Sequence, residues 1–241
     1  MTDSTALDYW RAGLTDVPDE VWHHPRLEVL LLADNALTDL PARIGTLTDL
    51  HTLDLGHNGL RTVPAELGDL PALSRFLYLH DNDLTELPAS LGRLTRLAYL
   101  NVGKNRLTAL PDTLGSLTDL VELRAQHNEL TGLPETVGSL TELRELWLRG
   151  NQLSELPISV RHLTGLRELE LRENAFTAVP AALRGLPRLR RVDLRSNHVR
   201  ELPDWICELP ALEKLDLRWN DTRVSDHHIR TLQAKGCVIL H

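Results

Sequence analysis

Histidine and cysteine are the residue types in this chain that could bind a metal or attack a substrate. The chain has 11 histidines and 2 cysteines, Cys207 and Cys237. The pairs His23–His24 and His227–His228 are sequence neighbours, whose side chains point apart on a helix or a strand and do not chelate one metal. The sequence contains neither a phosphate-binding loop nor a nucleophile elbow. We therefore expect no catalytic centre, no cofactor and no metal site.

A different chemistry, recognition of another protein, is suggested by aromatic residues at fixed distances before a recurring asparagine. Phe76 and Tyr99 lie six residues before such an asparagine, and Tyr78 and Trp147 lie four residues before one. Because these positions alternate with leucines, they should face solvent from one side of a sheet. Aromatic side chains are enriched at the centres of protein interfaces. We predict a partner-binding surface of aromatic residues and intervening polar residues: Phe76, Tyr78, Tyr99, Asn101, Arg124 and Trp147.

One turn near this surface is longer than the others by a single residue. The interval from Asn58 to Asn82 is 24 residues, and the segment LSRFLYL has one residue more than its counterpart in the next turn. An extra residue in a strand usually forms a β-bulge that redirects side chains. We expect a bulge here, which leaves an alternative in which Phe76 turns inward to fill it.

A column of arginines forms the second candidate region. The residue two positions before each of four successive asparagines is arginine, and an acidic residue precedes three of these arginines by two positions. One interpretation is an internal ladder of ion pairs, which contributes little when exposed. The other is a ridge that binds an acidic segment of a partner, with an adjacent tryptophan as anchor. The candidate residues are Arg149, Arg172, Arg195, Arg218 and Trp219.

These columns exist only if the chain repeats, and it does. An asparagine recurs nine times, and seven of the eight intervals are 23 residues. A fixed period in this range is typical of a stacked solenoid. The recurring asparagines are Asn35, Asn58, Asn82, Asn105, Asn128, Asn151, Asn174, Asn197 and Asn220.

One turn reads LTDLHTLDLGHNGLRTVPAELGDL, over residues 47–70. This pattern resembles the leucine-rich repeat, L-x-x-L-x-L-x-x-N-x-L followed by x-x-L-P-x-x-L-G-x-L. The 23-residue form with Leu-Pro is similar to that of Ras-suppressor-like, Scribble-like and bacterial intracellular proteins. The resemblance implies a curved solenoid that binds other proteins.

The residues of one turn support the same α/β repeat fold. Leu53 and Leu55 alternate with polar residues, so stacked turns should build a parallel sheet on the concave side. The asparagine amides can bond the backbone where the chain leaves the strand. A proline recurs on the opposite side, which favours extended or short 3₁₀ segments on the convex side.

The two ends differ from the regular repeats. We predict a single domain over residues 1–241, with a degenerate capping turn at residues 1–26, regular repeats at 27–220 and a C-terminal cap at 221–241. In the cap, Ser225 and Gly236 are signals for the start and the end of a short helix. A final strand over residues 237–240 should then close the sheet.

Composition narrows the possible environment and partners. The formal net charge is -8, which argues against general binding to nucleic acid or to an anionic membrane. The first ten residues lack the features of a signal peptide, and no apolar run is long enough to span a bilayer. Extracellular members of the leucine-rich repeat family, which this sequence resembles, usually carry cysteine-rich caps, and neither end of this sequence has one. We expect a cytoplasmic protein.

Together these observations predict a non-catalytic scaffold or adaptor that binds a protein through the concave face. The alternative is a structural homo-oligomer, such as a homodimer, in which two copies bury their aromatic surfaces against each other.

Overall fold

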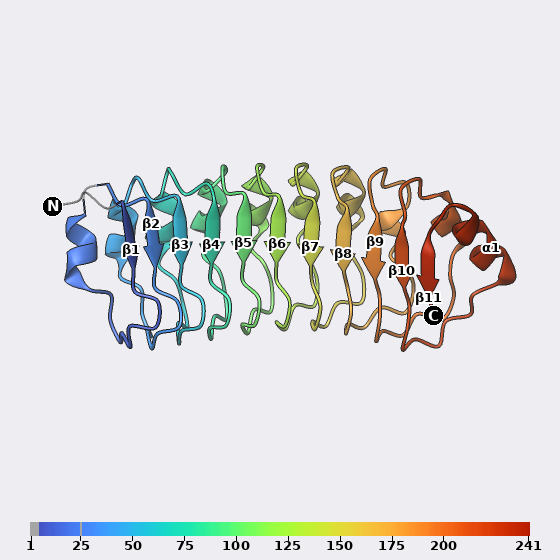
Figure 1. Cartoon of the computed structure of the whole chain (residues 1–241), viewed down its shortest axis with the longest axis horizontal. Helices are drawn as coiled ribbons and strands as arrows, with labels where there is room; N and C mark the ends of the chain where they lie inside the picture. The colour runs from blue at the N-terminus through green and yellow to red at the C-terminus, as the bar shows by residue number, and fades with distance from the viewer. Residues whose placement is uncertain (1–4, 25) are drawn as a thin grey trace.

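The computed structural model describes residues 5–24 and 26–241, in which eleven parallel strands form one sheet in chain order. Figure 1 shows the strands side by side along the long axis of the molecule. Each strand has three residues. They are β1 (Ala6–Asp8), β2 (Val29–Leu31), β3 (Thr52–Asp54), β4 (Phe76–Tyr78), β5 (Tyr99–Asn101), β6 (Glu122–Arg124), β7 (Glu145–Trp147), β8 (Glu168–Glu170), β9 (Arg191–Asp193), β10 (Lys214–Asp216) and β11 (Val238–Leu240).

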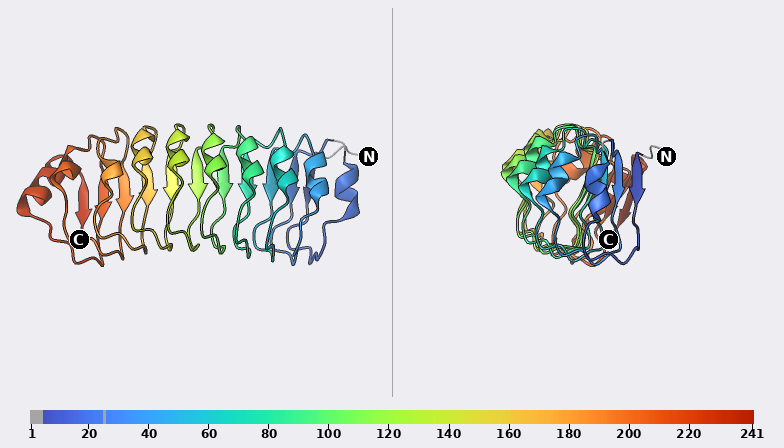
Figure 2. Two further views of the ribbon diagram at one scale, coloured as in Figure 1. Left: turned by 180° about the vertical axis from the view of Figure 1, so that it is seen from behind. Right: turned by 90° about the vertical axis from the view of Figure 1, so that its left-hand side faces the viewer.

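Short 3₁₀ helices lie on the side of the solenoid away from the sheet (Figure 2). Each begins directly after a proline, whose fixed φ suits a first helical turn. The predicted 3₁₀ segments are therefore confirmed. They are η1 (Asp19–His23), η2 (Ala42–Thr46), η3 (Ala65–Asp69), η4 (Ala89–Arg93), η5 (Asp112–Ser116), η6 (Glu135–Ser139), η7 (Ile158–His162), η8 (Ala181–Leu183) and η9 (Asp204–Glu208).

The core runs unbroken between the sheet and the 3₁₀ helices. The central residue of each inner strand points inward, as at Leu53 and Leu100, which are both fully buried. Leucines of the connecting segments, such as Leu60 and Leu67, are fully buried as well. Burying one such side chain stabilises the fold by about 1.5–3 kcal/mol. Each turn contributes leucines or other apolar residues at the same positions, so the stack is held together over its whole length.

The recurring asparagines form a hydrogen-bonded ladder inside the stack. The side-chain amide of Asn128 donates to the Val102 carbonyl of the preceding turn at 3.0 Å and to the Ala125 carbonyl at 3.2 Å. Its oxygen accepts from the Leu107 backbone N–H at 3.0 Å. All nine asparagines, from Asn35 to Asn220, make these three kinds of bond. The ladder satisfies backbone groups where the chain leaves the sheet.

The predicted β-bulge at the long turn is wrong. Strand β4 pairs residue for residue with β3 and β5, and Phe76 points outward with 41% of its surface exposed. The extra residue lies just before the strand. There the N–H groups of Ala98 and Tyr99 bond two separate carbonyls, those of Ser74 and Arg75, whereas in the following turn two successive N–H groups share one carbonyl. The additional carbonyl absorbs the insertion, so the register of the sheet is unchanged.

The C-terminal end folds as its capping signals predict. Helix α1 (Asp226–Ala234) begins after Ser225, whose hydroxyl accepts from the His228 N–H at 3.2 Å. It ends near Gly236, which adopts a left-handed φ of 78°. Strand β11 then pairs with β10 and completes the sheet. The buried His228 ring lies 3.0 Å from Asp204 of η9, which ties the helix to the last repeat.

The asparagine ladder makes a direct stability prediction. We expect Asn128→Ala to lower the free energy of unfolding by about 1–3 kcal/mol, because buried backbone groups of two turns lose their partners. Chemical denaturation of the purified protein measures this change. Glu129→Ala is the matched control, since Glu129 is the exposed neighbour of Asn128. Equal stability of the two variants would contradict the structural role of the ladder.

Candidate functional site

The outward-facing residues of the sheet form regular columns, as the repeat period predicts. In the register of β3 to β6, Phe76 pairs with Tyr99, and Tyr78 pairs with Asn101, which in turn pairs with Arg124. The same column continues through Trp147 and the acidic end residues of β8, β9 and β10. We call this outward side of the sheet the sheet face. Residues from distant parts of the sequence are neighbours on it because parallel strands stack in register.

Phe76, Tyr78 and Tyr99 form one aromatic cluster. The ring centroids are 5.9 Å apart for Phe76 and Tyr78, 5.6 Å for Phe76 and Tyr99, and 5.0 Å for Tyr78 and Tyr99. These separations are those of favourable aromatic pairs. Burial raises the pKa of Tyr99 to about 12, so its phenol stays neutral and can still form hydrogen bonds. The structure therefore brings the three predicted aromatic residues into mutual contact.

Arg124 connects this cluster to Trp147. Its guanidinium carbon lies 5.9 Å from the centre of the Tyr99 ring and 5.0 Å from that of Trp147, within the range of a cation–π contact. Glu122 accepts a hydrogen bond from the Arg124 side chain, and Glu145 accepts one from the Trp147 indole N–H at 3.1 Å. The predicted aromatic residues thus form a continuous surface over β4 to β7, with an arginine as the link.

The cluster extends beyond the predicted residues to His80. Its ring lies 5.9 Å from Tyr78 and 4.9 Å from His57, which pairs with Asp81 at 3.0 Å. Burial lowers the pKa of His80, so this ring favours the neutral form. His80 stands two residues before its asparagine, in the same column as the arginines. That position is the signal by which sequence reasoning could have included it.

Asn101 lies in the same region, but only 6% of its surface is exposed. Its side-chain oxygen accepts from the Gly103 backbone N–H at 3.0 Å, and Asp54 does the same for Gly56 at 2.9 Å. A short polar side chain at the end of the strand therefore satisfies the next backbone N–H. This contact gives Asn101 a structural role.

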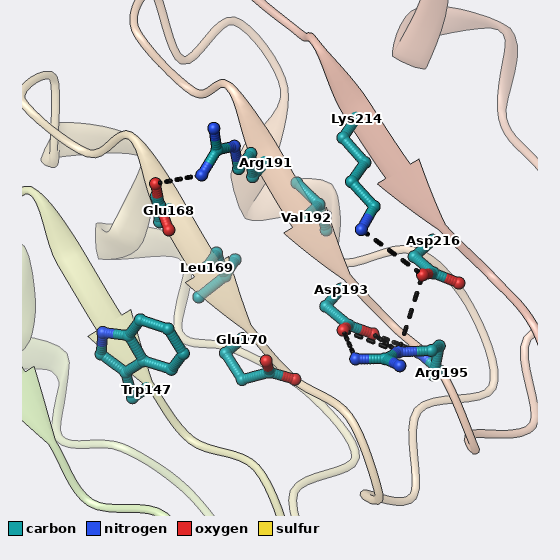
Figure 3. A pocket seen from close by; sticks show the side chains of 10 residues that line it. All are labelled: Trp147, Glu168, Leu169, Glu170, Arg191, Val192, Asp193, Arg195, Lys214 and Asp216. Carbon is teal, nitrogen blue, oxygen red and sulfur yellow. Dashed lines mark hydrogen bonds and ion pairs between the residues drawn. The ribbon is translucent and has the colours of Figure 1, made fainter. Parts of the chain in front are cut away.

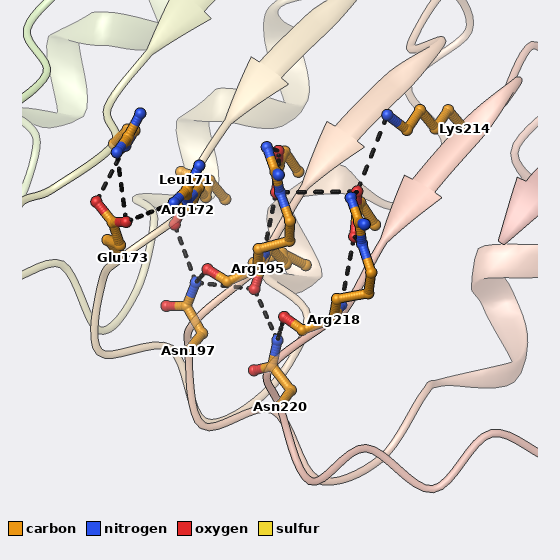
Figure 4. Close-up of polar contacts among 12 residues, drawn as sticks. Leu171, Arg172, Glu173, Arg195, Asn197, Lys214, Arg218 and Asn220 are labelled. Atoms are coloured by element: carbon orange, nitrogen blue, oxygen red, sulfur yellow. Dashed lines mark hydrogen bonds and ion pairs between the residues drawn. The ribbon is translucent and has the colours of Figure 1, made fainter. Parts of the chain in front are cut away.

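The arginine column is paired internally, as Figure 4 shows for its C-terminal part. Arg149 and Arg172 both contact Glu173, at 3.0 Å and 2.8 Å. Arg195 bonds Asp193 and lies 3.6 Å from Asp216, which also binds Arg218 at 2.7 Å. Burial acts to raise the pKa of Asp216, but hydrogen bonds from Arg218 outweigh it and lower the pKa. Of the two interpretations of the arginine column, these pairs match the internal ladder of ion pairs.

Glu173 is the acidic partner that sequence reasoning missed. It stands one position before its asparagine, where the backbone adopts a left-handed φ of 57°. Trp219 occupies the same position in a later turn, with a φ of 61° and 63% of its surface exposed. The Trp219 ring centre lies 5.6–5.8 Å from three guanidinium carbons, those of Arg172, Arg195 and Arg218. The position of Glu173 could have been recognised from the sequence, because it is equivalent to that of Trp219, which the sequence already indicates as a candidate beside the arginine column.

A cavity of about 200 Å³ opens on the sheet face between the aromatic surface and the arginine column. Figure 3 shows Trp147 and Glu170 on one side of it and Asp193, Arg195 and Lys214 on the other. No ion pair joins Glu170 to another residue in the described part of the chain, and its Oε1 atom is buried without a hydrogen-bond partner. Burial and the neighbouring Asp193 raise the pKa of Glu170. Among the acidic end residues of β8, β9 and β10, Glu170 is therefore the uncompensated acid, in the sense that it alone has no ion pair within the described residues.

The described residues also bear on metal binding and on membrane insertion. Within residues 5–24 and 26–241, no three histidine, cysteine, aspartate or glutamate residues are grouped so as to hold a metal ion. No helix in the same ranges has the length and apolar character that a membrane crossing requires. Cys207 and Cys237 are both buried, and burial raises the pKa of each thiol.

Family models identify the repeats. The model described as a leucine-rich repeat region matches residues 66–179, and the model described as leucine rich repeat matches residues 25–84 and 164–221. A search of curated proteins gives no match.

Solved structures share the fold over nearly the whole chain. A leucine-rich repeat protein of Leptospira interrogans is 27% identical, with a TM-score of 0.67, over 97% of this chain and 76% of that one. The ectodomain of the Arabidopsis thaliana receptor kinase GASSHO1/SCHENGEN3, in complex with CASPARIAN STRIP INTEGRITY FACTOR 2, is 30% identical with a TM-score of 0.79. The match covers 90% of this chain and 27% of the receptor chain.

The plant peptide hormone receptor RGFR1, in complex with RGF2, is 27% identical with a TM-score of 0.73, over 93% of this chain and 41% of that one. With the matched repeat models and the eleven-stranded parallel sheet, these structures place the chain in a single class. The chain is a leucine-rich repeat protein. Domains of this family are typically protein-interaction modules without catalysis.

The state of Glu170 predicts how stability depends on pH. A carboxyl group whose pKa is raised in the folded protein costs stability as pH rises through the interval between its unfolded and folded pKa. We therefore expect Glu170→Gln to raise the melting temperature at pH 7, and this gain to shrink below a pH of about 4, where the native carboxyl is protonated in both states. Thermal unfolding followed by circular dichroism across this range measures the effect.

Asp193→Asn is the matched control because Asp193 is bound by Arg195. Removing this paired carboxylate should lower the melting temperature at pH 7. If Glu170→Gln also lowers it, Glu170 is stabilised in the native protein and the assignment of an uncompensated acid is wrong.

Proposed function

We propose that this chain is a non-catalytic scaffold that binds a protein or peptide segment along its sheet face, across β4 to β7. The observation that carries this proposal is the unbroken series of contacts from Phe76 through the two tyrosines and Arg124 to Trp147. These side chains stand outside the leucine core, so packing of the solenoid does not require them there. Aromatic and arginine residues are the types that contribute most binding energy at protein interfaces.

The arrangement of this surface suits an extended segment of a partner. Successive turns present one row of side chains at the spacing of strands, about 4.8 Å. Rings held in contact with each other lose little side-chain entropy when a partner covers them. The family is used for protein binding, and the two plant receptors above are in complex with CASPARIAN STRIP INTEGRITY FACTOR 2 and with RGF2. The cytoplasmic location predicted from the sequence belongs to the same proposal.

The sheet-face prediction is tested by removing the aromatic cluster. We expect the double substitution Tyr78→Ala and Tyr99→Ala to weaken partner binding by at least about 2 kcal/mol, or roughly thirtyfold, because it removes the centre of the proposed interface. The partner is first isolated by affinity capture from the native host with the unchanged protein. Biolayer interferometry with the purified partner then gives the dissociation constants.

Ile158→Ala is the matched control, because it removes an exposed apolar side chain from η7 on the opposite side of the solenoid. A partner that binds the aromatic double variant as well as the unchanged protein, but loses affinity for the Ile158 variant, would refute the sheet face as the site. Light scattering of the purified protein tests the alternative function, a homo-oligomer that buries its aromatic surfaces. A dimer that the double variant dissociates identifies a second copy of the chain as the occupant.

A further inference from the structure

The cavity on the sheet face differs from the rest of that face in its shape and charge. Its walls come from four successive strands, β7 to β10. Its volume of about 200 Å³ is below the 300–1,000 Å³ that is usual for small-molecule sites, so it fits one side chain better than a whole ligand. It adjoins the aromatic surface through Trp147. A segment bound along β4 to β7 would therefore reach it with its next residue.

Each cation that lines the cavity is already bound to an acid. Arg191 lies 3.0 Å from Glu168, and Lys214 lies 3.9 Å from Asp216. Arg195 bonds Asp193 through two nitrogens. The lining therefore has no cation left over for an incoming anion. It contains four acidic and three basic side chains, and the acid in excess is Glu170.

The Glu170 carboxylate is placed to receive a cation from outside. Its Oε1 atom is buried and has no donor in the described chain. Such an atom keeps the cost of its lost hydration until a donor reaches it. Trp147 is the direct neighbour of Glu170 in the sheet register, so an indole ring stands beside the carboxylate. A cation between them would gain a charge-assisted hydrogen bond from one side and a cation–π contact from the other.

We propose that this cavity recognises a basic side chain, arginine or lysine, of the bound partner, with Glu170 as its counter-ion and Trp147 as its aromatic wall. This inference rests on the proposed function and adds the chemical class of the partner residue that follows the aromatic contacts. It also explains why an acid that weakens the fold lines a cavity whose cations are all paired with other acids. Residues at binding sites often lower stability in this way.

A titration followed by nuclear magnetic resonance tests the cavity without knowledge of the partner. The probes are acetyl-arginine-amide and acetyl-lysine-amide, and the readout is the Trp147 indole N–H signal, assigned with Trp147→Phe. We expect either or both basic probes to shift this signal saturably, and we expect acetyl-citrulline-amide, which has the shape of arginine without its charge, to leave it unchanged. Comparing the two basic probes shows whether a guanidinium or an ammonium group is preferred.

Glu170→Gln should lower the affinity for the basic probes by about tenfold or more, because the charge-assisted bond is lost. Glu129→Gln, with the same change of charge at an exposed site outside the cavity, should leave their affinity unchanged. Equal affinity in the Glu170 and Glu129 variants overturns the proposal. So does a Trp147 signal that responds to citrulline as it does to arginine, or that responds only to acetyl-glutamate-amide, which would point to an acidic partner.

Binding of the captured partner to the variants distinguishes the scaffold function from the basic-residue cavity. If Tyr78→Ala and Tyr99→Ala abolish its binding while Glu170→Gln leaves the dissociation constant unchanged, the basic-residue cavity is wrong and the scaffold function stands. If neither change affects binding, the sheet face itself is not the binding site. Loss of binding in both variants supports both proposals.

Discussion

The hydrogen-bonded asparagine ladder is the interaction on which the rest of this structure depends. A chain that turns sharply after a three-residue strand leaves backbone N–H and C=O groups inside the molecule without sheet partners, and such groups are costly when unpaired. A buried amide in each turn answers this need by bonding carbonyls of its own turn and of the preceding one, while accepting an N–H. Because each asparagine bonds backbone groups of both its own turn and the preceding one, the ladder sets both the period and the register of the sheet.

The ladder also determines which positions are free to carry function. The asparagines and leucines are committed to the interior, and the strand residues between the leucines point outward. Residues just before each asparagine adopt a left-handed backbone and place their side chains beside the sheet face, as Glu173 and Trp219 do. Short polar residues at the strand ends, such as Asn101 and Asp54, are drawn into capping backbone N–H groups. The candidate binding residues therefore lie at outward positions whose side chains do not cap the backbone.

Two parts of the sheet face illustrate different uses of this freedom. In the arginine column, most charges find partners within the chain, so the region is electrostatically satisfied and its guanidinium groups are held in place by neighbouring acids. In the aromatic surface and the adjoining cavity, the aromatic rings lie outside the core, and an uncompensated carboxylate lowers stability. A solenoid with one continuous leucine core tolerates this cost, since its stability is a sum over many similar turns. The second region is where we place recognition.

The amino-acid sequence by itself determined the solenoid, the parallel sheet, the 3₁₀ side and the capped terminal helix. Their signals are periodic or local: a 23-residue repeat, leucine alternation, prolines, Ser225 and Gly236. It also placed the aromatic residues in neighbouring columns, because equivalent positions of successive turns lie next to each other when the strands stack in parallel. Only the tertiary structure decided that the insertion lies before β4, that Glu173 pairs with two arginines, and that Glu170 stays unpaired. These outcomes depend on how side chains from several turns compete for the same partners, and that competition is settled by three-dimensional geometry rather than by spacing along the chain.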